Sequence, residues 1–84
     1  MKVEYLKKYN NKANVVGELI KKYREQMKLS KPELCRRLQL HAVYMDHAEL
    51  YRIEQGEKIL RDFELLAICK ELNIDYKELK NMVD

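Results

Sequence analysis

The sequence predicts an all-α fold in a single small domain. Its 84 residues suffice for one domain. Two glycines and one proline leave little material for the many tight turns of an all-β protein. Between residues 14 and 84, apolar residues recur at helical spacing behind residues that favour helix starts. We therefore expect a helical domain over residues 14–84, preceded at 1–13 by an arm, a short helix or a short strand.

The first helix is expected over residues 15–27. Asn14 precedes it and can cap its free amides. Inside this helix, apolar residues at helical spacing form one stripe that can face a core: Val16, Leu19, Ile20, Tyr23 and Met27.

Three later helix starts carry the pattern of a capping box, in which glutamate follows the cap residue three positions later. The cap side chain can accept from an amide of the first turn, while the glutamate accepts from the cap residue's own N–H. These boxes pair Ser30 with Glu33, Asp46 with Glu49, and Asp75 with Glu78. They predict helices over residues 31–39, 47–55 and 76–82, and the apolar pattern adds another over 62–72.

The inward faces of these helices follow from their apolar spacing. Gly56 follows the third helix and favours the left-handed conformation that ends a helix. We expect the following side chains in the core: Leu34, Cys35 and Leu38 in the second helix, Leu50 and Ile53 in the third, Leu65, Leu66, Ile68, Cys69 and Leu72 in the fourth, and Leu79 with Met82 or Val83 in the last.

Charge is unevenly distributed along the chain. The net charge is +3, with +7 over residues 1–37 and −4 over residues 38–84. A basic half is consistent with a polyanionic partner, and equally with a solvated surface. No apolar run approaches the roughly 20 residues that a membrane span requires.

The side chains that carry chemistry exclude several classes of function. Cys35 and Cys69 form no Cys-x-x-Cys pattern, and His41 and His47 have no ligand partner at a metal-site spacing. We therefore expect no metal site, and reduced thiols in a cytoplasmic protein. The sequence has no nucleophile–base set and no glycine-rich phosphate loop, so we expect neither an enzyme nor a bound cofactor.

Four segments in order resemble the XRE/Cro-type helix-turn-helix domain of phage repressors and bacterial regulators. They are Lys-Lys-Tyr-Arg-Glu (21–25), Leu-Ser-Lys-Pro-Glu-Leu (29–34), Tyr-Arg-Ile-Glu-Gln-Gly (51–56) and Leu-Leu-Ala-Ile-Cys-Lys-Glu-Leu (65–72). The resemblance extends over residues 16–79. It implies a five-helix, lambda-repressor-like bundle in which the helix from His47 lies in the major groove of DNA.

The resemblance also implies roles for individual residues. Arg24 and Glu54 match a structural ion pair of the family, and the alternative is two solvated charges. The recognition helix is expected to present four side chains to base edges: His47, Ala48, Tyr51 and Arg52. Three more side chains are expected near phosphate: Lys31, Gln55 and Lys58.

Two features depart from the family pattern. Residues 39–45 form an unusually long connection before Asp46. Its apolar content favours packing on the core, and the alternative is that Tyr44 or His41 reaches the DNA backbone or a protein partner. Asp46 and Glu49 are acidic where phosphate is close; Glu49 either completes the cap or accepts from a cytosine amino group.

The sequence therefore predicts a sequence-specific transcriptional regulator, a repressor, that binds double-stranded DNA as a homodimer. Leu60, the last helix and the N-terminal segment are the candidate dimer surfaces. The alternative is a protein-interaction module with the same fold, such as an antitoxin bound to its toxin. The acidic C-terminal half and the long connection motivate that alternative.

Overall fold

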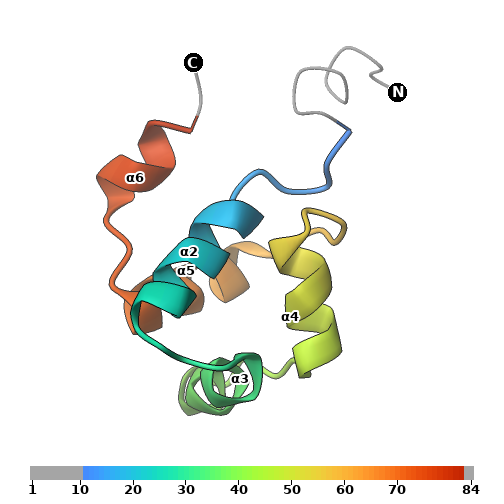
Figure 1. The fold of residues 1–84 in the computed structure, drawn as a ribbon, viewed down its shortest axis with the longest axis vertical. Coiled ribbons are helices and arrows are strands. Elements are labelled where there is room, and N and C mark those ends of the chain that lie inside the picture. The colour runs from blue at the N-terminus through green and yellow to red at the C-terminus, as the bar shows by residue number, and fades with distance from the viewer. Residues whose placement is uncertain (1–10, 83–84) are drawn as a thin grey trace.

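The computed structural model describes residues 11–82. Within them the chain forms only helices: α2 (Gly17–Gln26), α3 (Lys31–Leu38), the short 3-10 helix η1 (Gln39–His41), α4 (His47–Glu54), α5 (Asp62–Leu72) and α6 (Tyr76–Lys80). The helices α2 to α5 surround one core, and α6 lies at one end of the molecule (Figure 1). Across residues 11–82, the predicted all-α class with five α-helices is confirmed. The predicted N-terminal arm falls largely outside the described residues.

Asn14 organises the start of α2 and the turn after α4 at once. Its Oδ1 accepts from the N–H of Val16 at 3.1 Å and of Gly17 at 2.8 Å. Its Nδ2 donates to the carbonyl oxygens of Ile53 at 3.1 Å and Lys58 at 2.9 Å. The sequence predicted the cap but not these two long-range hydrogen bonds, which attach the end of α4 to α2.

The three predicted capping boxes have different outcomes. Asp46 forms the complete box, because its carboxylate accepts from Glu49 N–H at 2.8 Å and Glu49 accepts from Asp46 N–H at 3.1 Å. Ser30 caps α3 by accepting from Glu33 N–H at 3.2 Å, while the Glu33 carboxylate pairs with arginines on its own helix. The hydrogen bond from Arg36 is the main cause that lowers the pKa of Glu33, and the charges of Arg36 and Arg37 lower it further.

The third box is wrong, and a different cap was missed. Asp75 accepts from Lys77 N–H at 3.2 Å, one residue earlier than the box requires. At the start of α5, the Glu64 carboxylate accepts from Arg61 N–H at 2.9 Å. Arginine offers no acceptor for the first turn, so the sequence pattern gave no signal there.

The core follows most of the predicted inward faces, but Leu66 and Met27 are exposed, and Leu65 is half-buried outside the core cluster. Leu66 is exposed, because the buried side of α5 runs through Glu64, Ala67, Ile68 and Leu72 and leaves Leu66 outside. Met27 is also exposed at the end of the α2 stripe. Seven side chains are almost completely buried: Ile20, Leu34, Leu38, Leu50, Ile53, Ile68 and Leu72.

The long connection before α4 packs on the core through alternate residues. Val43 and Met45 are buried, whereas Leu40 is 80% exposed and Tyr44 is 72% exposed. Ala42 has φ 59°, a left-handed turn that reverses the chain after η1. Core packing of the connection is therefore confirmed for its inward side chains, whereas Leu40 and Tyr44 remain exposed and His41 Nε2 lies 2.7 Å from Glu71 Oε2 of α5.

A glycine allows α2 to approach the end of α4 closely. A Cβ on Gly17 would meet the carbonyl oxygens of Ile53 and Glu54, the latter at 2.7 Å. Gly56 has φ 79° and ends α4 in the predicted left-handed conformation. The two glycines therefore fix where α4 ends and how near it lies to α2.

Candidate DNA-binding site

The helix α4 is held firmly at both ends and along its inner side. The Asp46–Glu49 box satisfies amides at its start. Leu50 and Ile53 are fully buried beneath it. The exposed side chains of α4 therefore project from a fixed backbone, which favours a binding site of defined geometry.

Arg24 and Glu54 anchor the far end of α4. Arg24 Nε donates to Glu54 Oε2 at 2.7 Å, and Arg24 Nη2 donates to Oε1 at 3.0 Å. Arg24 Nη1 also donates to Leu29 O at 2.8 Å. The side chains are 7% and 1% exposed, so the alternative of two solvated charges does not hold. The hydrogen bond to Glu54 raises the pKa of Arg24 above its usual value.

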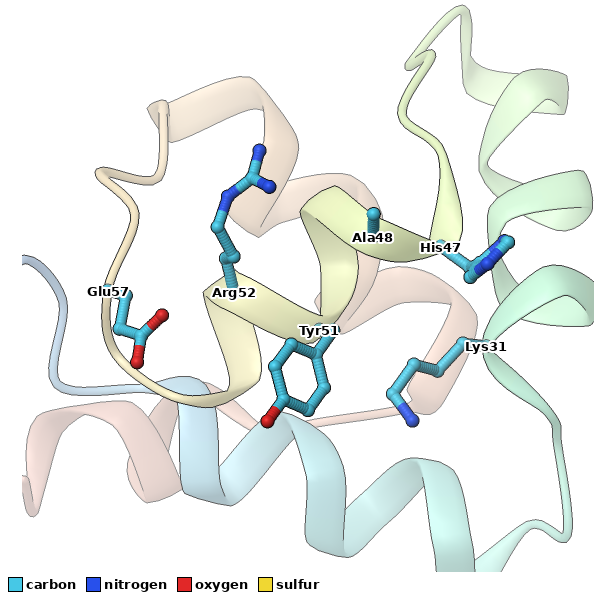
Figure 2. A pocket seen from close by; sticks show the side chains of 6 residues that line it. All are labelled: Lys31, His47, Ala48, Tyr51, Arg52 and Glu57. Carbon is cyan, nitrogen blue, oxygen red and sulfur yellow. The ribbon is translucent and has the colours of Figure 1, made fainter.

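The outer face of α4 borders a shallow hollow shared with the start of α3. All four predicted base-reading residues line it (Figure 2). Lys31, predicted at phosphate, lines it as well. The complete lining is Lys31, His47, Ala48, Tyr51, Arg52 and Glu57.

Lys31 and Arg52 place positive charge on opposite sides of this hollow. Lys31 is the first residue of α3, and its Nζ lies 5.7 Å from the centre of the Tyr51 ring. In Figure 2 the Arg52 guanidinium points to the other side of α4 from Lys31. Cations on opposite sides of α4 can contact different phosphates of one polyanion.

The other predicted phosphate residues lie outside the hollow. Tyr44 is exposed just before α4, Gln55 caps its end, and Lys58 follows the Gly56 turn. Gln55 N–H donates to Tyr51 O at 3.0 Å, and Lys58 O accepts from Asn14. These two hydrogen bonds involve the backbone of Gln55 and Lys58, not the side chains that would contact phosphate. The phosphate roles of Tyr44, Gln55 and Lys58 stay predictions.

Glu57 is the residue of this hollow that sequence reasoning missed. The left-handed turn at Gly56 directs the chain back, so that Glu57 N–H donates to Arg52 O at 2.9 Å. No helical spacing relates Glu57 to α4, and the only sequence signal was its place directly after a terminating glycine. Its carboxylate adds one negative charge among the cations of the hollow.

The thiols take no part in this site. Cys35 is buried and Cys69 half-buried, and burial raises the pKa of both. A protonated thiol is a weak nucleophile and a weak metal ligand. In residues 11–82 no three His, Cys, Asp or Glu side chains gather as a metal site would need, and no helix there has the length and apolarity to cross a bilayer.

Two short helices joined by a connection, with the second presenting an open face of polar and basic side chains, define a helix-turn-helix domain. A helix-turn-helix family model matches residues 20–79, which is most of the chain. The chain belongs to the XRE/Cro-type helix-turn-helix family and is a DNA-binding helix-turn-helix regulator. No curated protein and no solved structure gives a significant match.

Proposed function

We propose that this chain is a sequence-specific repressor that inserts α4 into the major groove of double-stranded DNA. The observation that carries the proposal is the hollow, where His47, Ala48, Tyr51 and Arg52 come together with Lys31. A rigid helix of eight residues fits the groove, and its outward side chains then face base edges.

The chemistry of these side chains supports a division of roles. Arg52 carries the planar donors that match guanine, and Ala48 offers a methyl group to thymine. His47 can donate or accept a hydrogen bond. Lys31 supplies a point charge for phosphate, which strengthens binding to every DNA sequence equally. Tyr44, Gln55 and Lys58 flank this face as candidate backbone contacts.

The proposal includes binding as a homodimer. Phe63 and Leu66 are 51% and 66% exposed and lie about one turn apart on α5, and Ile59, 72% exposed, lies in the connection before this helix. A second copy of the same face is the partner that would cover them, and helix-turn-helix dimers bind half-sites about 34 Å apart. Leu60, a candidate from the sequence, instead packs against the core.

The DNA proposal is tested with a duplex that the full chain selects from a randomised pool. Affinity for it should fall steeply between about 50 and about 200 mM salt, because phosphate contacts release counterions. Arg52→Ala should reduce the preference for the selected duplex over a scrambled one. Lys31→Ala should weaken both duplexes alike and reduce the salt slope by about one.

Lys80→Ala is the matched control, because it removes one lysine from α6, which lies away from α4 (Figure 1) and does not line the hollow. It should leave the preference between the two duplexes unchanged. Failure of the chain to select any duplex, or equal losses in all three variants, would contradict the proposal.

A protein-interaction role is the second candidate, and the open face of the connection favours it. Leu40 and Tyr44 are the most exposed large apolar side chains near α4. The product of a neighbouring gene, such as a toxin, is the partner to test. Loss of that complex in a Leu40→Ser/Tyr44→Ser variant, with no DNA binding by the wild type, would favour this role over DNA recognition.

A further inference from the structure

Lys31 and Tyr51 come from different helices and meet across the hollow. The distance of 5.7 Å from Lys31 Nζ to the ring centre lies within the roughly 6 Å over which an ammonium is attracted to an aromatic face. Figure 2 shows the Lys31 side chain and the Tyr51 ring on the same side of α4. Among residues 11–82, no carboxylate lies within ion-pair distance of Lys31, so the ring is its charge-stabilising neighbour.

Both backbones at this contact are fixed. Ser30 caps α3 directly before Lys31, and the ring of Pro32 directly after it restricts the first turn. Tyr51 follows Leu50, which is fully buried. The mobile part is therefore the four-carbon stem of Lys31, which carries substantial rotamer freedom.

We propose that Tyr51 acts as a positioning residue for Lys31, in place of the base-reading role that the resemblance implied for it. Its ring face holds the ammonium beside α4 before DNA arrives, and Lys31 then contacts a phosphate. This inference rests on the proposed DNA-binding function and deepens it. A side chain restrained near its bound position loses less conformational freedom on binding, which increases affinity without a new DNA contact.

The proposal separates the ring of Tyr51 from its hydroxyl group. A positioning role requires only the aromatic face, whereas base reading by tyrosine requires the hydroxyl as donor or acceptor. Tyr51→Phe keeps the ring and removes the hydroxyl. Tyr51→Leu removes both and keeps an apolar side chain.

The chain offers a matched control in α6. Lys80 Nζ lies 5.9 Å from the ring centre of Tyr76, which is a lysine–tyrosine contact of nearly the same length. Neither residue lines the hollow. Tyr76→Leu therefore breaks an equivalent contact without affecting Lys31.

The first experiment needs no DNA. NMR of the full chain measures the side-chain proton shifts of Lys31, which the ring current of Tyr51 should move upfield. The upfield shift should persist in Tyr51→Phe and Tyr76→Leu and disappear in Tyr51→Leu. A Lys31 signal that is identical in wild type and Tyr51→Leu overturns the proposal.

The second experiment measures affinity for the selected duplex. Tyr51→Phe and Tyr76→Leu should bind like wild type, while Tyr51→Leu should bind about two- to fivefold more weakly. In a Lys31→Ala background, Tyr51→Leu should add no further loss, because the two residues act through one contact. Equal losses in Tyr51→Phe and Tyr51→Leu, or independent effects of Tyr51 and Lys31, overturn the proposal.

The two experiments also distinguish this inference from the function on which it rests. If the wild type binds no duplex, the phosphate role of Lys31 fails together with the proposed function, whereas the NMR shift still decides whether Tyr51 holds Lys31. If DNA binds and the shift is absent, the positioning role alone fails.

Discussion

Arg24 of α2 and Glu54 of α4 form a two-point ion pair, with Nε–Oε2 at 2.7 Å and Nη2–Oε1 at 3.0 Å. A third bond from Arg24 to Leu29 O extends the contact to the turn before α3. The Arg24 guanidinium thus links α2 to the end of α4 and to the turn that precedes α3.

Removing one member of this pair should be more damaging than removing both. Arg24→Met leaves the Glu54 carboxylate buried without its partner and should cost about 3–5 kcal/mol in free energy of unfolding. Arg24→Met/Glu54→Leu removes both charges and should cost less than either single change. Urea unfolding compares Arg24→Met, Glu54→Leu and the double variant. A double variant less stable than both single variants would contradict this expectation.

Gly17 should tolerate no side chain. The Cβ of Gly17→Ala would lie 2.7 Å from Glu54 O, so α2 must move away from α4. We expect a loss of about 1–3 kcal/mol, typical of overpacking. Glu18→Ala on the exposed side of α2 is the control and should change stability by less than about 0.5 kcal/mol. Thermal unfolding compares both variants with the wild type. A Gly17→Ala variant as stable as the wild type would contradict the close contact between α2 and α4.

The connection over residues 39–45 should respond to substitution in an alternating pattern. Met45→Ala removes a buried side chain and should cost about 2–5 kcal/mol. Tyr44→Ala removes a larger but exposed side chain and should change stability by less than about 0.5 kcal/mol. Chemical denaturation distinguishes the two, and similar losses at both positions would mean that the connection does not pack as described.

The buried thiols should make stability fall at alkaline pH. Burial raises the pKa of Cys35 and Cys69, so the folded chain retains their protons above the pKa of about 8.5 that applies to unfolded thiols. This contribution is fully present below that unfolded value and is lost as the pH rises through the folded values. The free energy of unfolding should therefore decrease more steeply above about pH 8.5 in wild type than in Cys35→Ala/Cys69→Ala. Parallel pH profiles would contradict the shift.

Sequence patterns predicted the helices well because their determinants are local. Asp46 and Glu49 lie three residues apart, and the hydrogen bonds of their box close within one turn. The apolar faces containing Leu34 and Leu50 likewise follow from helical period alone. The resemblance to a family added the long-range Arg24–Glu54 contact, which no local pattern indicates.

The features that the sequence did not predict depend on how segments far apart in the chain pack together. Nothing in the sequence near Asn14 specifies that its amide reaches Ile53 and Lys58. Glu57 enters the hollow only because Gly56 reverses the chain. Leu66 is exposed because packing selected the neighbouring face of α5, although the apolar pattern allowed both.

The most direct test of the central proposal is an NMR titration of the full chain with the duplex that it selects. Amide signals of α4 and of the first turn of α3 should shift most, together with the side chains of His47 and Arg52, while α6 signals should change little. Shifts centred on α6 or on Leu40 and Tyr44, with α4 unchanged, would contradict the account.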